Sequence, residues 1–210
     1  PTLVRALNNA GAQLTDIIMV AAGETWSMAL TNTGNVYTWG RNDLGQVGDN
    51  TGNAMQIFPV RLRGARGGGY MGNVIDIAAG DHHGLVVRSD GSVYSWGVSS
   101  DGRLGLGSGN VGDNNRKLAP EKVMKDAQTG LSGIIAVAAG AAHSMALTRG
   151  DAADEVADGN RVYAWGLNSD GQLGNGSTGG LSWYPVAVNG IRNITSISAG
   201  GNFSLAQVRE

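Results

Sequence analysis

Cysteine is absent from the 210-residue chain, and proline and histidine are scarce, with four and three copies. The lack of cysteine excludes disulfide bonds and thiol chemistry, although it does not decide the cellular compartment. Three histidines are too few for an obvious all-histidine metal site. No apolar run approaches the roughly 18–20 residues of a membrane-spanning helix, so no membrane insertion is expected. The formal net charge of −2 offers no overall positive field for nucleic acid, and no nucleic-acid partner is predicted.

Glycine is the residue that the chain has in excess. Its 35 copies make up about 17% of the residues, against a usual share of about 7%. They follow no collagen-like triplet, so they indicate many tight turns. Several of them fall in phrases that recur along the chain.

Three short phrases recur in the same order. The Ala-Gly phrase occurs four times, at spacings of 57, 60 and 60 residues, and a Trp-Gly phrase and a Gln-Gly phrase follow it three times each. A fixed period of about 20–50 residues or slightly more is typical of a solenoid, propeller or array. The Ala-Gly phrases are Val20–Gly23, Ile77–Gly80, Val137–Gly140 and Ile197–Gly200; the Trp-Gly phrases are Tyr37–Gly40, Tyr94–Gly97 and Tyr163–Gly166; the Gln-Gly phrases are Gly45–Gly48, Gly102–Gly105 and Gly171–Gly174.

Each repeat contains a predicted β-hairpin. In the first repeat, Ser27–Leu30 leads through the turn Thr31–Asn35 into Val36–Trp39. Short runs rich in β-branched and aromatic residues around a glycine-containing turn are typical of hairpins, and glycine interrupts any alternative helix. Two more strands are predicted in each repeat, one that contains a proline (Pro59 in the first case) and one that ends in the Ala-Gly phrase. The fold class is therefore all-β.

The phrases resemble those of the regulator-of-chromosome-condensation (RCC1-like) repeat family. The match is closest in the third repeat, with Ala139-Gly140-Ala141-Ala142-His143-Ser144, Tyr163-Ala164-Trp165-Gly166 and Gly171-Gln172-Leu173-Gly174. Members of that family fold as β-propellers, typically with seven blades of four antiparallel strands. The resemblance covers nearly the whole chain and implies about three and a half such blades. It also implies that the tryptophans of the Trp-Gly phrases belong to the core.

The chain is expected to form one domain, 1–210. Counted from the proline-containing strands, its repeats are 1–58, 59–119 and 120–184, with a half repeat at 185–210. Three and a half blades do not close a seven-bladed ring. Because the first residue is Pro1 and no signal peptide is visible, we expect part of a longer propeller, with completion by another subunit as the alternative.

A ring stands three residues after each Ala-Gly glycine: Trp26, His83, His143 and Phe203. Since tryptophan and phenylalanine share this position with histidine, the ring is interpreted as packing beside the next blade and not as a metal ligand or acid/base group. A serine follows three of the rings, and a hydroxyl that recurs in several blades is interpreted as architectural. No catalytic, metal-binding or cofactor-binding residue is predicted.

The candidate partner-binding residues are those that the copies do not share. The third hairpin is acidic and longer, with 14 residues between Leu147 and Val162 against five in the others, which indicates either neutral drift or a projection towards a basic partner or cation. Trp183, beside Tyr184, is placed at the end of an inter-strand loop, where aromatic residues often anchor interfaces. The candidates are Glu24, Thr25, Trp26, Asp81, His82, Asn202 and Phe203 in the turns, Asp151, Asp154, Glu155 and Asp158 in the insertion, and Trp183.

These residues predict a non-enzymatic scaffold that binds a protein partner through its variable turns. The resemblance leaves three alternatives open: a regulator of a small GTPase like a guanine-nucleotide exchange factor, a secreted enzyme inhibitor or bacterial surface repeat protein, and a propeller lyase or hydrolase. The plant ultraviolet-photoreceptor branch is disfavoured because its Gly-Trp-Arg-His-Thr motif is absent. A bacterial and secreted or cell-surface setting is favoured over a eukaryotic one. No cofactor is expected.

Overall fold

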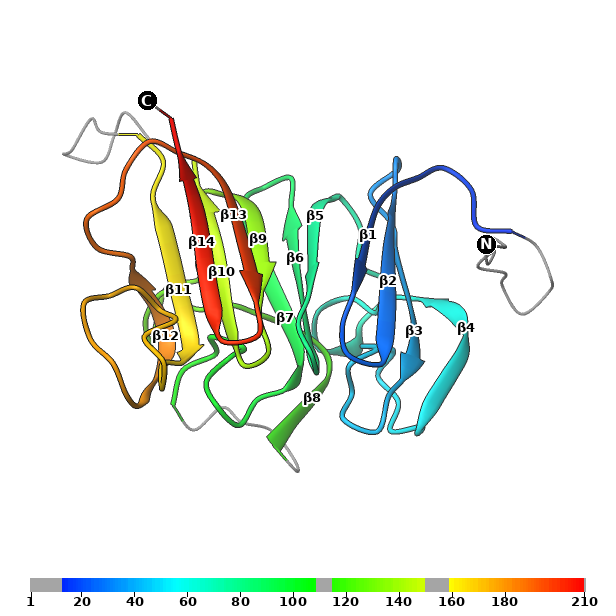
Figure 1. Ribbon diagram of the computed structural model, residues 1–210. Coiled ribbons are helices and arrows are strands. Elements are labelled where there is room, and N and C mark those ends of the chain that lie inside the picture. Colours follow the sequence, from blue (N-terminus) through cyan, green and yellow to red (C-terminus); the bar gives the residue numbers. More distant parts are fainter. Residues whose placement is uncertain (1–12, 109–114, 150–158, 210) are drawn as a thin grey trace, which may run out of the picture.

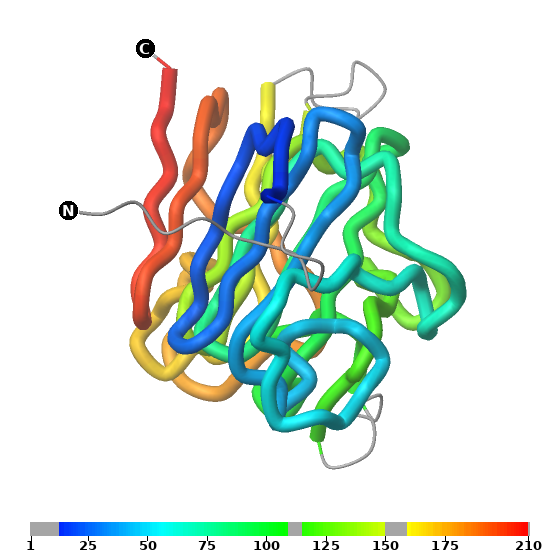
Figure 2. Tube along the Cα trace, turned by 90° about the vertical axis from the view of Figure 1, so that its right-hand side faces the viewer, coloured from blue at the N-terminus to red at the C-terminus, as the bar shows by residue number. Residues whose placement is uncertain are grey.

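The chain folds into four radially arranged antiparallel sheets in the computed structural model, which describes residues 13–108, 115–149 and 159–209. Three sheets have four strands and the last has two, so the expected all-β propeller of three and a half blades is confirmed. Figure 1 shows the sheets side by side, from β1 near the N-terminus to β14 at the C-terminus. In Figure 2 the N-terminal sheet faces the viewer.

Each blade follows the chain from one strand to the next. A single 3-10 turn, η1 (Ala65–Gly67), lies between blades 1 and 2. Blade 1 is β1 (Ile17–Ala22), β2 (Trp26–Thr31), β3 (Val36–Arg41) and β4 (Met55–Arg61); blade 2 is β5 (Val74–Ala79), β6 (His83–Arg88), β7 (Val93–Val98) and β8 (Arg116–Lys122); blade 3 is β9 (Ile134–Ala139), β10 (His143–Thr148), β11 (Val162–Leu167) and β12 (Leu181–Ala187); half-blade 4 is β13 (Ile194–Gly200) and β14 (Phe203–Val208).

The proline-containing strands are the last strands of their blades. Pro59 lies in β4, Pro120 in β8 and Pro185 in β12, each paired with the strand that carries the Trp-Gly phrase. Proline donates no backbone hydrogen bond, so an edge strand is the place where a sheet tolerates it. The repeats counted from the prolines are therefore shifted by one strand against the structural blades.

The core lies between the blades. Trp26, Met28 and Leu30 of blade 1 pack with Val86 and Trp96 of blade 2 in one buried cluster. Two similar clusters join blade 2 to blade 3 and blade 3 to half-blade 4. A strand covered on both faces consists of almost continuously buried residues, as β6 and β10 do. In β1 and β14, at the two ends of the row of blades, more exposed residues alternate with less exposed ones.

One expectation about the core is wrong. Trp96 and Trp165 of the Trp-Gly phrases are fully buried, but Trp39 is only half-buried. Trp96 and Trp165 lie against the blade that precedes their own in the chain, and the described residues place no blade before blade 1.

Candidate interaction surface

The turns after the four Ala-Gly phrases come together at one end of the blades. We call them, with the Gln-Gly loops beside them, the turn face. Glu24 N donates to Asp81 O over 3.4 Å, and Ala141 N donates to Gly201 O over 2.9 Å. These bonds link blade 1 to blade 2 and blade 3 to half-blade 4. The turns lie at the same end of the blades, at the bottom of Figure 1.

The Gln-Gly loops begin beside these turns. Arg41 N donates to Thr25 O over 3.0 Å, Val98 N to His82 O over 2.9 Å and Leu167 N to Ala142 O over 2.9 Å. The residues that follow in each loop carry an aspartate close to the Gln-Gly phrase. These aspartates are Asp43, Asp101 and Asp170.

The glycine of the Ala-Gly phrase is required by close approach. A Cβ atom at Gly80 would lie 2.2 Å from His83 Cε1 and 2.5 Å from Gly140 O, and one at Gly23 would lie 2.0 Å from Trp26 Nε1. The ring three residues later folds back over its own glycine while the next blade's turn approaches from the other side. The repeated Ala-Gly phrase is therefore a packing requirement of the blade interface.

Three of the four rings, all but Phe203, bond to the next blade, beside which the sequence predicts this position to pack. Trp26 Nε1 donates to Gly80 O and Asp81 O, both over 3.1 Å. His83 Nε2 lies 2.9 Å from Ser144 Oγ, and His143 Nε2 lies 2.9 Å from Ser204 Oγ.

The hydrogen bonds between these histidines and serines run in the wrong direction for nucleophilic catalysis. Ser144 Oγ donates to Arg103 O over 2.8 Å, so its single proton is already used. His83 Nε2 must therefore donate to the serine oxygen, whereas a general base would accept the serine proton. Burial lowers the pKa of His83 well below its usual value, helped by the nearby charge of Arg103, and burial also lowers the pKa of His143. Both imidazoles are neutral framework groups.

The candidates in the turns separate into a buried and an exposed set. Trp26 is only 2% exposed, so its indole does not reach a partner on this face; the blade 2 carbonyls take its hydrogen bonds. Phe203, at the equivalent position of half-blade 4, is 58% exposed because no described blade follows it. Glu24 and His82 face each other at 3.4 Å. Asn202 Nδ2 donates to Asp170 Oδ2 over 2.9 Å.

Of the remaining candidates, the structure describes Trp183. Trp183 lies within β12, not at the end of a loop as expected, and is half-buried. Its carbonyl accepts a hydrogen bond from Gly107 N over 3.1 Å, which fastens the blade 2 loop to β12. Asp151, Asp154, Glu155 and Asp158 lie outside the described residues.

Two residues of interest were not singled out from the sequence. Arg103, where the other Gln-Gly phrases have glutamine, is buried, bonds to Asp101 and donates to Ala141 O over 3.1 Å. Asp76 accepts a hydrogen bond from Val137 N over 2.8 Å, and burial raises the pKa of its carboxyl. Aligning the repeats could have found both, because each residue differs in charge from its counterparts.

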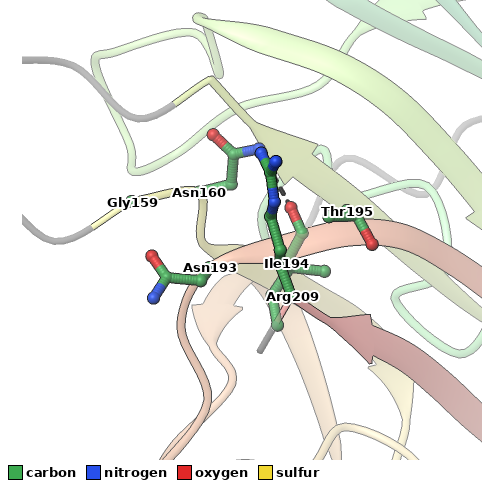
Figure 3. A pocket seen from close by; sticks show the side chains of 6 residues that line it. All are labelled: Gly159, Asn160, Asn193, Ile194, Thr195 and Arg209. Atoms are coloured by element: carbon green, nitrogen blue, oxygen red, sulfur yellow. Dashed lines mark hydrogen bonds between the residues drawn. The ribbon is translucent and has the colours of Figure 1, made fainter.

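A separate hollow lies at the opposite end of blade 3. It measures about 290 Å³, and Asn160 Nδ2 donates to Ile194 O over 2.9 Å at its wall (Figure 3). Its other lining residues are Gly159, Asn193, Thr195 and Arg209. Histidines and carboxylates are missing from this lining. Across residues 13–108, 115–149 and 159–209, no three metal-ligating side chains come together, and no helix is long and apolar enough to cross a membrane.

Comparisons with known proteins agree with this architecture. The model of the regulator of chromosome condensation (RCC1) repeat matches residues 33–87, 90–147 and 159–207, and a second RCC1-repeat model matches 17–46 and 74–103. The E3 ubiquitin-protein ligase HERC2 of Mus musculus is 32% identical over 194 residues, which cover 90% of this chain and 4% of that protein. The ultraviolet-B receptor UVR8 of Arabidopsis thaliana is 35% identical over 218 residues, covering 96% of this chain and 42% of the receptor.

Solved structures show the same fold. Prp20p from Saccharomyces cerevisiae, described with its binding to Gsp1p and histones, superposes with a TM-score of 0.73 at 25% identity over 93% of this chain and 44% of its own. Yeast RCC1 (Prp20) bound to Kap60 gives a TM-score of 0.73 at 26% identity, over 93% of this chain and 42% of that one. The chain thus spans less than half the length of these relatives. The family models match most of the chain, its three phrases recur in register, and it forms three and a half four-stranded blades. The chain therefore belongs to the RCC1-repeat family.

Proposed function

We propose that this chain is a non-enzymatic, protein-binding propeller segment whose contact surface is the turn face. The observation that carries the proposal is the set of hydrogen bonds that hold neighbouring turns together: backbone bonds join the turns of blades 1 and 2 and those of blade 3 and half-blade 4, and Arg103 of blade 2 donates to Ala141 O of blade 3. A surface ordered before binding loses less conformational entropy when a partner docks.

The charges on the turn face favour a partner with a basic surface. Arg41 neutralises Asp43 and lowers the pKa of that carboxyl. Arg103 forms an ion pair with Asp101. The remaining acidic side chains are Glu24, Asp81 and Asp170. Like-charged groups on a rigid surface accelerate and orient the approach of an oppositely charged partner.

The family supports a binding role over a catalytic one. The yeast relative is described as binding Gsp1p and histones, and its structure with Kap60 is a protein complex. RCC1 repeats are generally interaction modules, and the 4% of HERC2 that this chain covers does not carry the whole ligase. The histidine–serine pairs are framework groups. The bacterial, cell-surface setting stays a prediction.

The test replaces exposed residues of the turn face. The variant Glu24→Ala/His82→Ala/Asn202→Ala should lose the partners that affinity capture with mass spectrometry recovers for the unaltered protein. Its folding should be unaffected, because these side chains lie on the surface. The control is Lys125→Ala/Gln128→Ala, two exposed residues on the loop after β8, outside the turns that follow the Ala-Gly phrases. If the triple variant retains every partner at unchanged affinity, the turn face is not the contact surface.

A further inference from the structure

Two arginines and a tyrosine come together where the chain leaves blade 1. The guanidinium carbon of Arg61, the last residue of β4, lies 4.9 Å from the centre of the Tyr70 ring, and that of Arg63 lies 5.1 Å from it. Cation–π contacts of this length restrict a guanidinium and leave its N–H groups free to donate hydrogen bonds. We call these three residues the arginine cluster.

The backbone of the arginine cluster is held by the core. Arg63 and Tyr70 face each other in an isolated antiparallel bridge. Their neighbours Leu62 and Met71 are buried, and Met71 N donates to Leu62 O over 3.0 Å. The three side chains therefore stand on backbone that is ordered before a ligand binds, which lowers the entropic cost of binding.

The two positive charges of the cluster lack a carboxylate partner among the described residues. Arg61 Nη2 donates to the neutral Asn35 Oδ1. Neither Arg61 nor Arg63 takes part in an ion pair within 13–108, 115–149 and 159–209. Arg66, in η1, is instead paired with Glu121 of β8 over 3.4 Å. Two like charges beside one ring repel each other, and an anion that accepts from both removes this repulsion.

A groove of about 600 Å³ opens beside the arginine cluster. Asp49, which also lines it, is only 6% exposed and accepts hydrogen bonds from Thr51 and Gln56. The groove thus combines one positive site with apolar groups, neutral groups and one occupied carboxylate. This distribution suits a single compact anion on an uncharged chain better than the evenly spaced charges of a nucleic acid. Its other lining residues are Phe58, Pro59 and Val60.

The arginine cluster distinguishes blade 1 from the other blades. At the corresponding places, blade 2 carries Lys122, Met124 and Gly130, and blade 3 carries Ala187 and Asn189. Lys122 is exposed although blade 1 precedes its blade. A side chain at this position therefore remains accessible whether or not another blade lies before it.

We propose that the arginine cluster binds a phosphorylated serine or threonine side chain of a protein partner. A phosphate group carries a charge of about −1.5 to −2 near pH 7 and three acceptor oxygens, so it can accept from both guanidiniums. Pairs or clusters of arginines are a recurring means of recognising phosphopeptides. The groove accommodates the residues that flank the phosphorylated one. The site uses none of the residues that the turn-face test replaces, and the proposal goes beyond the proposed function.

Fluorescence anisotropy with labelled peptides tests the site. The probe is a pool of short peptides with a central phosphoserine and mixed uncharged residues on both sides. We expect the pool to bind the full chain about tenfold more tightly than the same pool with unphosphorylated serine. Arg61→Gln/Arg63→Gln should remove this difference.

A matched control separates the arginine cluster from net charge. Lys122→Gln/Lys125→Gln removes the same two charges from exposed residues at the end of β8 and in the connection after it, and should leave binding unchanged. Tyr70→Ala keeps both arginine charges and removes the ring that positions them. Its affinity for the phosphoserine pool should fall about threefold to tenfold. Its urea midpoint should stay close to that of the unaltered protein, because Tyr70 is 54% exposed.

Any of five results overturns the proposal. The first two are equal binding of the phosphorylated and unphosphorylated pools, and equal losses in the arginine and lysine double variants, which would attribute binding to net charge. Equal affinity for a pool with central glutamate would identify an acidic peptide as the ligand. Tighter binding of oligothymidylate, lost in the arginine variant, would identify a nucleic acid, and equally tight binding of inorganic phosphate would identify the free ion. None of these results bears on the turn face.

Discussion

At the scale of single residues, the Ala-Gly phrase forms a contact between neighbouring blades. Its glycine leaves room for the ring three residues later and for the carbonyl of the next turn. The ring itself is exchangeable, since tryptophan, histidine and phenylalanine all occupy the position. What the position needs is a flat side chain over a residue without a Cβ atom. The phrase is therefore a structural feature of the interface between blades.

Gly80→Ala should destabilise the protein by about 2–4 kcal/mol, because the added methyl group overlaps the buried His83 ring and the Gly140 carbonyl, and a packed interface relaxes poorly. Urea unfolding followed by tryptophan fluorescence measures this. Gly200→Ala is the matched control at the same position of half-blade 4. There the nearest atoms belong to the exposed Phe203 ring, which can turn away, so the loss should stay below about 1 kcal/mol. Equal losses at both positions would contradict this account of the glycine.

At the scale of elements, the strands were largely predictable and their partners were not. Periodicity and turn residues indicated four strands in each repeat, and these strands are present. The sequence did not show that Pro59 closes the first blade, that Trp183 lies within a strand, or that Trp39 is half-buried. Each of these depends on which strand or blade lies alongside, a contact between residues far apart in the chain.

Trp165→Phe should lower the free energy of unfolding by about 1–3 kcal/mol, because the smaller ring leaves a void and gives up the hydrogen bond to Arg103 O. Trp39→Phe changes the same phrase in blade 1, where the indole is half-buried and has no hydrogen-bond partner among the described residues. Its cost should be clearly smaller. Urea denaturation of both variants measures the two losses in free energy of unfolding. A larger loss for Trp39→Phe would contradict the expectation that a tryptophan of the first blade contributes less than one buried against a preceding blade.

At the scale of the whole molecule, stability is distributed over the interfaces between blades, since each buried cluster joins two of them. Two of the interfaces bury a neutral histidine bonded to a serine of the next blade. The pKa values of His83 and His143 lie below their ordinary value in the folded state. Protonation consequently favours the unfolded chain.

The midpoint of urea unfolding should therefore fall as the pH is lowered from about 7.5 to about 5.5. An unfolded histidine has a pKa of about 6.5, so below that value the unfolded state binds protons that the native state does not, and stability rises with pH. The stability that the neutral histidines contribute is complete above the pKa of an unfolded histidine and is lost as the pH falls below that value. His83→Phe/His143→Phe should flatten this dependence, since phenylalanine already occupies the equivalent position at Phe203. An unchanged slope in the double variant would exclude the two histidines as its source.

The candidate contact surface was only partly predictable. The sequence indicated the turns after the Ala-Gly phrases, and the structure does bring them to one edge. It predicted that the ring of Trp26 packs beside the next blade, but not that this burial leaves only 2% of the residue exposed to a partner. Nor did it show that Arg103 and the aspartates of the Gln-Gly loops lie on the same face. Burial of a ring depends on whether a following blade covers it. That is why Trp26 and Phe203, at equivalent positions, are 2% and 58% exposed.

The sequence by itself determined the fold class, the repeat and the family, because short apolar strands, glycine turns and recurring phrases are local patterns that a chain displays in order. Only the tertiary structure decided which tryptophans are buried against the preceding blade and which histidines are neutral. Those properties belong to contacts between blades some 60 residues apart in the chain. Identical phrases therefore have different surroundings in the middle of the row of blades and at its ends.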